Sequence, residues 1–256
     1  MDKTKSANEI QQELFERYPQ IKICQESIMC CYNELVQCFR RGGKLLVAGN
    51  GGSASDSEHI AGELLKSFLF RREISSDLAN RLEYYFGNEG TELAGLLEGA
   101  CPVISLSSMT SINTAFANDV DSTAAFAQVL NGLSLKDDVF LGISTSGNSR
   151  NILLAFMVAK AKGIKSILLT GGNGGACREI ADVAICVPEA ETFKIQELHL
   201  PIYHAVCAMV EAELFEEKSK RCRSDGRRCN DKFKNGRTSR DFYFGRRRLY
   251  DRQISI

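Results

Sequence analysis

The stretch "KLLVAGNGGSASDSEHIAGE", residues 44–63, joins an apolar run to a glycine- and serine-rich loop and then to a polar segment. The apolar run has the length and composition of a buried β-strand. Glycines in the loop let backbone N–H groups come close to a ligand, and a following helix adds a dipole that favours an anion. The stretch therefore predicts a strand, a ligand-binding turn and a helix, in that order.

The same strand pattern recurs four more times along the chain. The other apolar runs are PVISLS (102–107), DVFLGIS (138–144), KSILLT (165–170) and DVAICV (182–187). Amphipathic stretches lie between them, such as residues 148–163, which end in a glycine suited to a helix C-cap. Strands that alternate with helices predict a doubly wound α/β fold, with a mainly five-stranded parallel sheet covered by helices on both faces.

Helices are also expected at both ends of this α/β body. Residues 6–17 predict a short helix, and residues 20–41 predict a long one with an apolar stripe. Residues 192–217 predict one further long helix. Residues 71–100 contain helical pieces interrupted by glycines, and for them a flap and an interface element are both open.

Charge divides the chain into two parts. Residues 218–256 hold 14 of the 32 Lys and Arg residues but only 4 of the 32 Asp and Glu residues, so a body of formal charge −10 carries a tail of +10. We expect residues 1–217 to form one domain, and the tail, which lacks helical and strand periodicity, to be disordered. An arm that binds nucleic acid or an acidic partner is the alternative interpretation of the tail. For the body we expect no nucleic-acid partner.

Composition and motifs argue against several classes of protein. No run of 18 apolar residues occurs, which argues against a membrane span, and the first 19 residues lack the apolar core of a signal peptide. The ten cysteines form no C-x-x-C pair, which indicates reduced, mostly structural thiols in a cytoplasmic protein. The loops match neither G-x-x-x-x-G-K-[ST] nor G-x-G-x-x-G, which argues against a nucleotide-hydrolysing P-loop and a dinucleotide site.

Three predicted strands run into glycine- or serine-rich turns. These are GNGGSAS (49–55), STSGNS (144–149) and TGGNGG (170–175). In a doubly wound sheet, ligands bind beyond the carboxyl ends of the strands, where such turns collect. Backbone N–H groups and hydroxyls at these turns can hold a phosphate group without a lysine. A single loop of this kind is also typical of a plain turn before a capped helix, but two serine-rich loops at matching strand ends favour a phosphate site.

All three histidines lie in two segments that we expect to be helical. His59 and Glu63 share one helix face, where they can chelate a divalent ion, transfer a proton or simply form an exposed pair. In IQELHLPIYH, His199 and His204 point about 140° apart around the helix and are not expected to serve one site. Gln196 lies about 12 Å of helix rise from His204, so one ion can take both only at a frayed helix start or between two chains.

Together, GNGGSASDSEHIAGEL, ANDVD, GISTSGNSRNILLAFMVAKAKGIKSILLTG and IQELHLPIYHAVC resemble the phosphoheptose isomerase family, which has the sugar isomerase (SIS) fold. The resemblance covers about residues 9–217. It implies an aldose–ketose isomerase that converts sedoheptulose 7-phosphate to D-glycero-D-manno-heptose 7-phosphate through an enediol, the first step of activated heptose biosynthesis. It also implies one zinc ion per active site and a cytoplasmic homotetramer with active sites at subunit interfaces.

The resemblance also implies roles for individual residues. The phosphate-binding loop is matched by Ser144, Thr145, Ser146 and Ser149. The first substrate loop is matched by Asn50, Gly51, Gly52 and Ser53, and a sugar-contacting pair by Asn118 and Asp119. The zinc ligands are matched by His59, Glu63, Gln196 and His204. Of these, Glu63 and Gln196 are also expected to contact the substrate, with Glu63 as the catalytic base and His204 as the catalytic acid.

The chain departs from the family pattern in places. Residues 71–100 are longer than in compact members, the basic tail has no counterpart, and Phe193 stands where some members carry a polar residue. Two other functions stay open. One is a non-catalytic SIS protein that binds a sugar phosphate or a protein partner, like a homologue that assists the bacterial replication initiator. The other is an isomerase of a different phosphosugar. The presence of the four expected zinc ligands favours an enzyme.

Overall fold

The structure is a computed structural model in which residues 5–216 are described, so the predicted disordered tail lies outside the described residues. Five strands form one parallel sheet in the order β2-β1-β3-β4-β5. They are β1 (Leu45–Gly49), β2 (Val103–Ser105), β3 (Val139–Ile143), β4 (Lys165–Gly171) and β5 (Val183–Val187). All five predicted strands are confirmed, and the doubly wound α/β prediction with them.

The strand order shows where a ligand crevice is expected. The chain passes from β1 to β2 on one side of β1 and then to β3 on the other side, so the strand order reverses between β1 and β3. In open α/β sheets, ligands bind at this reversal, beyond the carboxyl ends of the strands. The loops that follow β1 and β3 are the two serine-rich loops of the sequence, residues 49–55 and 144–149.

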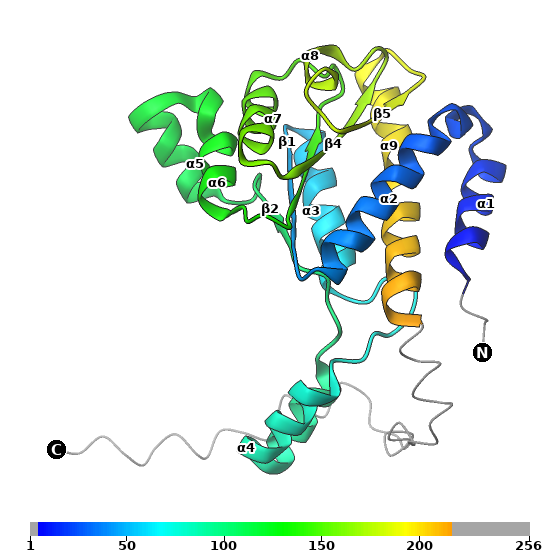
Figure 1. The fold of residues 1–256 in the computed structure, drawn as a ribbon, viewed down its shortest axis with the longest axis vertical. Helices are drawn as coiled ribbons and strands as arrows, with labels where there is room; N and C mark the ends of the chain where they lie inside the picture. The colour runs from blue at the N-terminus through cyan, green and yellow to red at the C-terminus, as the bar shows by residue number, and fades with distance from the viewer. Residues whose placement is uncertain (1–4, 217–256) are drawn as a thin grey trace, which may run out of the picture. The chain divides into compact units, whose positions relative to one another are not determined.

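Helices cover both faces of the sheet, and each face has its own apolar core (Figure 1). One face carries α1 (Ala7–Arg17), α2 (Gln25–Arg40), α3 (Gly52–Leu65) and α9 (Thr192–Glu211). The other carries α6 (Ala125–Leu133), α7 (Arg150–Lys162) and α8 (Gly175–Arg178). Successive strand residues point to opposite faces, so in β1 Leu45 and Val47 join the first core while Leu46 and Ala48 join the second. This two-sided burial explains why the strands are continuous apolar runs.

Two predicted long helices are each built of two segments. The predicted helix at 20–41 begins as a 3-10 helix, Pro19–Cys24, and α2 starts only at Gln25. Its buried residues Ile21 and Cys24 are three apart, the spacing that a 3-10 helix places on one side. The predicted helix at 192–217 ends as α9 at Glu211 and continues as a π-helical turn, Ala212–Glu216, where Glu213 bonds to side chains of α2.

Residues 71–100 form a helical hairpin. α4 (Ser76–Leu96) turns at Gly87, whose φ of 56° lies in the left-handed region that favours glycine. Gly90 lets the second arm approach the first, because a Cβ there would lie 1.9 Å from the carbonyl oxygen of Leu82. Within α4 only Gly90 is buried. The predicted helical pieces with glycine breaks are confirmed, and the choice between a flap and an interface element stays a prediction.

The sequence also argues against a membrane span. Within residues 5–216, no helix has both the length and the apolar character that crossing a bilayer requires.

Candidate functional site

The loop after β1 turns tightly into α3. Gly51 has a φ of 55°, and Gly52 lies so close to Gln196 of α9 that a Cβ would sit 2.6 Å from the Gln196 Nε2 atom. Ser53 is buried at the start of α3. A side chain at position 52 would therefore have to displace the end of the Gln196 side chain. Two sets predicted separately from the sequence, the first substrate loop and Gln196, meet here within one chain.

The loop after β3 forms a compact turn at the start of α7. The hydroxyl oxygens of Ser144 and Ser149 lie 2.9 Å apart and share a hydrogen bond. Gly147, with a φ of 63°, donates its backbone N–H to the Ser144 carbonyl at 3.0 Å. Ser146 accepts the backbone N–H of Asn148 at 3.2 Å. The predicted phosphate-binding hydroxyls thus lie within one turn, at the positive end of a 13-residue helix.

The third glycine-rich loop, residues 170–175, packs against the second loop and bonds to its backbone. A Cβ on Gly147 would lie 1.8 Å from the carbonyl oxygen of Gly174. The backbone N–H of Gly171 donates to the Thr145 carbonyl at 3.1 Å, and the N–H of Cys177 donates to the Gly147 carbonyl at 2.9 Å. We therefore interpret TGGNGG as a support for the serine loop rather than as a separate binding site.

An amide pair joins the first two loops across the β1–β3 crevice. Asn50 Nδ2 donates to Asn151 Oδ1 at 2.9 Å, and Asn151 Nδ2 donates to Asn50 Oδ1 at 2.8 Å. Asn50 was predicted from the sequence as a substrate residue, whereas Asn151 was missed. The only signal was its place in the first turn of α7, directly after the serine loop. The pair fixes the distance between the two loops that are expected to hold the substrate.

Helices α3 and α9 run side by side in the same direction. Gly52 faces Gln196 near the start of both helices, and His59 faces His204 further along. Because seven residues separate Gly52 from His59, these two contacts lie about 10 Å apart along α3. Gln196 belongs to regular helix rather than to a frayed start. The alternative of a frayed helix is therefore not supported, and Gln196 and His204 lie at different levels of the crevice.

His59 stands at the centre of a polar cluster. Its Nε2 atom lies 3.2 Å from Glu63 Oε1 and 3.4 Å from His204 Nε2. The side chain of His59 is 42% exposed, but that of Glu63 is only 12% exposed, which does not fit an exposed surface pair. Burial, and then the charge of His59, lower the pKa of His204, while Glu63 acts in the opposite direction. The structure thus unites three of the predicted catalytic and metal-binding residues.

The donor atoms of this cluster fit zinc in part. A tetrahedral zinc ion with bonds of about 2 Å has ligand atoms about 3.3 Å apart, so both distances from His59 Nε2 match edges of such a site. As they stand, however, no three His, Cys, Asp or Glu side chains within residues 5–216 are grouped to hold a metal ion. Gln196, a residue of α9, lies beside the opposite end of α3, next to Gly52. Two ligand contacts therefore suit zinc, and the complete predicted set is not assembled within the described part of one chain.

His199, the third histidine, is a core residue. It is fully buried, and among residues 5–216 neither ring nitrogen has a partner at hydrogen-bonding geometry. Burial lowers the pKa of His199 to about 4, with the Thr170 backbone acting in the opposite direction. The prediction that His199 and His204 serve different places is confirmed.

The predicted sugar-contacting pair, Asn118 and Asp119, lies in a π-helical turn, Ala117–Asp121, after α5 (Thr110–Phe116). Both residues are exposed, and Asn118 Nδ2 donates to Asp119 Oδ1 at 2.8 Å. Within residues 5–216 they form no hydrogen bond to the other predicted substrate residues.

The same turn ends beside the start of α7. Hydrogen bonds from the Thr123 side chain and backbone hold the pKa of Asp121 below its usual range, and Arg150 adds to the effect. Arg150 directly follows the serine loop and was not predicted as a site residue. The structure thus places the turn near the serine loop without joining it to the site.

A buried ion pair anchors the end of α3. The side chains of Arg72 and Glu211 are fully buried, with Arg72 Nε 2.7 Å from Glu211 Oε1. Arg72 also donates to the backbone carbonyls of Leu64 at 2.7 Å and Glu63 at 2.8 Å. These are carbonyls that the helix end leaves without intrahelical partners. Sequence reasoning missed this anchor, although a carboxylate inside the apolar run AVCAMVEAEL was a signal for it.

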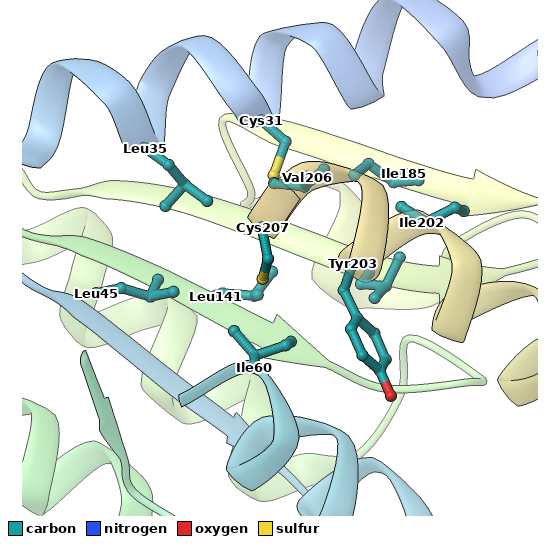
Figure 2. A pocket seen from close by; sticks show the side chains of 11 residues that line it. Cys31, Leu35, Leu45, Ile60, Leu141, Ile185, Ile202, Tyr203, Val206 and Cys207 are labelled. Atoms are coloured by element: carbon teal, nitrogen blue, oxygen red, sulfur yellow. The ribbon is translucent and has the colours of Figure 1, made fainter. Parts of the chain in front are cut away.

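An apolar cavity lies behind the cluster, between the sheet and helices α2, α3 and α9 (Figure 2). Its volume is about 20 Å³, far too small for a sugar phosphate. The lining residues are Cys31, Leu35, Leu45, Ile60, Leu141, Leu169, Ile185, Ile202, Tyr203, Val206 and Cys207. Figure 2 shows the Tyr203 hydroxyl pointing away from the other lining side chains. The cavity is therefore part of the core, and the candidate site lies outside it.

The chain is similar to known proteins over most of its length. Residues 108–212 match the SIS domain family. Phosphoheptose isomerase 2 of Campylobacter jejuni is 42% identical over 182 residues, which cover 71% of this chain and 78% of that one. The phosphoheptose isomerase of Sulfurimonas denitrificans is 36% identical over 214 residues, covering 84% and 94%. The solved phosphoheptose isomerase of Neisseria gonorrhoeae superposes with a TM-score of 0.61 at 29% identity, over 80% of this chain and 93% of that one.

Proposed function

Because this chain belongs to the phosphoheptose isomerase family, we propose that it converts sedoheptulose 7-phosphate to D-glycero-D-manno-heptose 7-phosphate through an enediol. This reaction is the first step of activated heptose biosynthesis. The observation that carries the proposal is the contact of His59 with both Glu63 and His204, beside the β1–β3 crevice of the sheet. A proton-transfer cluster next to two hydroxyl-rich loops is the arrangement that isomerisation of a sugar phosphate requires.

The phosphate group is proposed to bind the serine loop. The hydroxyls of Ser144, Thr145, Ser146 and Ser149 supply donors there. The start of α7 adds the positive end of its dipole. Arg150 adds a full positive charge in the first turn of that helix. The sugar end of the substrate would then extend over the first loop, Asn50 to Ser53, towards His59 and Glu63.

The proton transfer is assigned to Glu63 and His204. Glu63 is the proposed base that moves a proton between C1 and C2 of the sugar. Its position is supported by Arg72, which holds the Glu63 backbone carbonyl at 2.8 Å. His204 is the proposed acid that protonates the sugar oxygen. Burial lowers the pKa of His204, which makes its imidazolium a stronger acid while reducing the share of His204 that is protonated at neutral pH.

We propose one zinc ion per site, with His59, Glu63 and His204 as ligands in this chain. When bound, zinc would polarise the sugar carbonyl and stabilise negative charge on its oxygen. Gln196 would complete the set, also in contact with substrate, if α9 of another subunit or a shift of this one brings it to the ion. The two distances from His59 Nε2 support this assignment.

A homotetramer with sites at subunit interfaces is part of the same proposal. Its support is the apolar surface of α4, where Tyr84, Tyr85 and Phe86 are 82%, 66% and 64% exposed. Exposed aromatic residues at this density are typical of interfaces. A cytoplasmic location is proposed because none of the eight cysteines within residues 5–216 forms a disulfide there.

The test is an assay of heptose 7-phosphate formation from sedoheptulose 7-phosphate, with a chelator and with added zinc. We expect metal-dependent turnover, and a loss of about 10²–10⁴-fold in kcat for Glu63→Gln. Glu58→Gln is the matched control, because Glu58 is an exposed glutamate of the same helix. Without turnover, a substrate-induced rise in Tm would instead indicate a non-catalytic sugar-phosphate binder or an enzyme for another phosphosugar.

A further inference from the structure

Tyr203 contacts His59 of the proton-transfer cluster and has no role in the function proposed above. It directly precedes His204 in α9 and is 4% exposed. Its hydroxyl oxygen lies 3.1 Å from Nδ1 of His59 and 3.2 Å from Oδ1 of Asp56. Tyr203 thus touches the nitrogen of His59 that faces away from Glu63 and His204.

The core fixes the position of the Tyr203 ring. The ring lines the apolar cavity together with Ile60 and Ile202, while its hydroxyl points out of the cavity (Figure 2). The ring also makes edge contacts with the imidazoles of His59, at 5.5 Å between centroids, and of His204, at 5.0 Å. Because the Tyr203 ring is packed on these sides, its hydroxyl is held next to His59.

The hydrogen bonds of the Tyr203 hydroxyl assign the protons. A tyrosine hydroxyl has one proton, and an ionised aspartate can only accept. The hydroxyl proton goes to Asp56 Oδ1, so the bond with His59 Nδ1 requires that nitrogen to be the donor. Asp56 depends on this contact, because its other oxygen, Oδ2, is buried and has no hydrogen-bond partner in the described part of the chain.

We propose that Tyr203, backed by Asp56, is a positioning residue that holds His59 as the Nδ1–H tautomer, with the lone pair of Nε2 facing Glu63 and His204. In this state the Nε2 lone pair of His59 lies 3.2 Å from the carboxylate oxygen of Glu63, so a cation shared by these two atoms is favourable. Histidines that bind a metal commonly have a hydrogen bond at the other ring nitrogen, and this hydrogen bond fixes the tautomer. The proton on Nδ1 follows from the contact with Tyr203, and the purpose of the tautomer rests on the proposed function.

The first experiment is ¹⁵N NMR of the histidine side chains in metal-free protein, at a pH where the imidazoles are neutral. The chain has 3 histidines, so the spectrum is simple, and the signals missing in His59→Gln identify His59. We expect the proton of His59 on Nδ1 in the wild type and its movement to Nε2 in Tyr203→Phe. A wild-type proton on Nε2, or a Tyr203→Phe spectrum without change at His59, would overturn the proposal.

The second experiment measures zinc affinity by competition with a chromogenic chelator. We expect Tyr203→Phe to weaken zinc binding by about 10–100-fold. Tyr32→Phe is the matched control, since Tyr32 is also buried and its hydroxyl bonds to Glu213 at 3.3 Å, away from the cluster. An unchanged affinity in Tyr203→Phe would contradict the positioning role.

The two proposals fail separately. If Tyr203→Phe does not fold, the wild-type tautomer alone decides between support and refutation. If the wild-type chain has the Nδ1–H tautomer of His59 but does not turn over sedoheptulose 7-phosphate, the proposed function is refuted. The role of Tyr203 in fixing the tautomer then still holds.

Discussion

The polar cluster around His59 and the predicted sugar-contacting turn, two parts of one expected site, are held in the fold very differently. His59 and Glu63 are backed by Tyr203 and by the buried ion pair between Arg72 and Glu211. By contrast, α5 and the two short helical turns that follow it, residues 110–124, contain no buried residue.

We expect the firmly held cluster to serve proton transfer and the loosely held turn to serve substrate binding. Proton transfer requires donor and acceptor within hydrogen-bond distance, which a buried framework provides. A segment with few buried contacts opens at lower free energy and can close over a ligand. We therefore expect changes behind the cluster to act on stability and on kcat, and changes in residues 110–124 to act on KM.

The largest effect is expected from Arg72→Met. Removing the guanidinium leaves the Glu211 carboxylate buried without its charge partner, so the free energy of unfolding should fall by about 3–5 kcal/mol in chemical denaturation. Arg81→Met is the control, because its ion pair with Asp77 in α4 is exposed. The double variant Arg72→Met/Glu211→Leu should recover part of the loss, and an equal loss in the double variant would contradict the explanation.

The next effect is the pH dependence contributed by His199. The pKa of His199 is about 4 in the folded chain, against 6.5 for an ordinary exposed histidine, so between these values the unfolded chain binds more protons. The contribution of His199 to the free energy of unfolding should therefore be fully present above pH 6.5. The free energy of unfolding should then fall by about 3 kcal/mol as the pH drops towards 4. His199→Leu should flatten this part of the profile in denaturation experiments across pH. A variant profile parallel to that of the wild type would show that other groups cause the slope.

A smaller effect is expected for Asn151→Ala. The variant loses the two hydrogen bonds to Asn50, so unfolding should become easier by about 1–2 kcal/mol. Because Asn50 is then released from the crevice, KM for the sugar phosphate should rise. Asn80→Ala in α4 is the control, since Asn80 is exposed. A normal KM in Asn151→Ala would mean that the amide pair serves stability alone.

The smallest effect on stability is expected for Asn118→Ala. Its side chain is exposed and bonds to Asp119, so the free energy of unfolding should change by less than about 0.5 kcal/mol. If the turn closes over the sugar, KM should nevertheless rise in steady-state assays. An unchanged KM would remove Asn118 from the site, and a large loss of stability would show that the turn is packed as firmly as the cluster.

Local periodicity explains what the sequence could predict of the fold. Apolar runs of strand length, with helical stretches between them, predicted the five strands and the two loops at the β1–β3 reversal. It was less reliable at helix ends, where the chain forms the 3-10 segment Pro19–Cys24 and the π-helical turn Ala212–Glu216.

Of the candidate site, the sequence by itself determined the pairs that one helix or one loop brings together. His59 and Glu63 share a face, and His199 points away from His204, because these relations depend only on the helical repeat. Only the tertiary structure decided the contacts between segments distant in the chain. Asn50 and Asn151 are 101 residues apart, Arg72 and Glu211 are 139, and His59 and Tyr203 are 144. Such contacts arise from the packing of α3, α7 and α9 on the sheet, which no local pattern specifies.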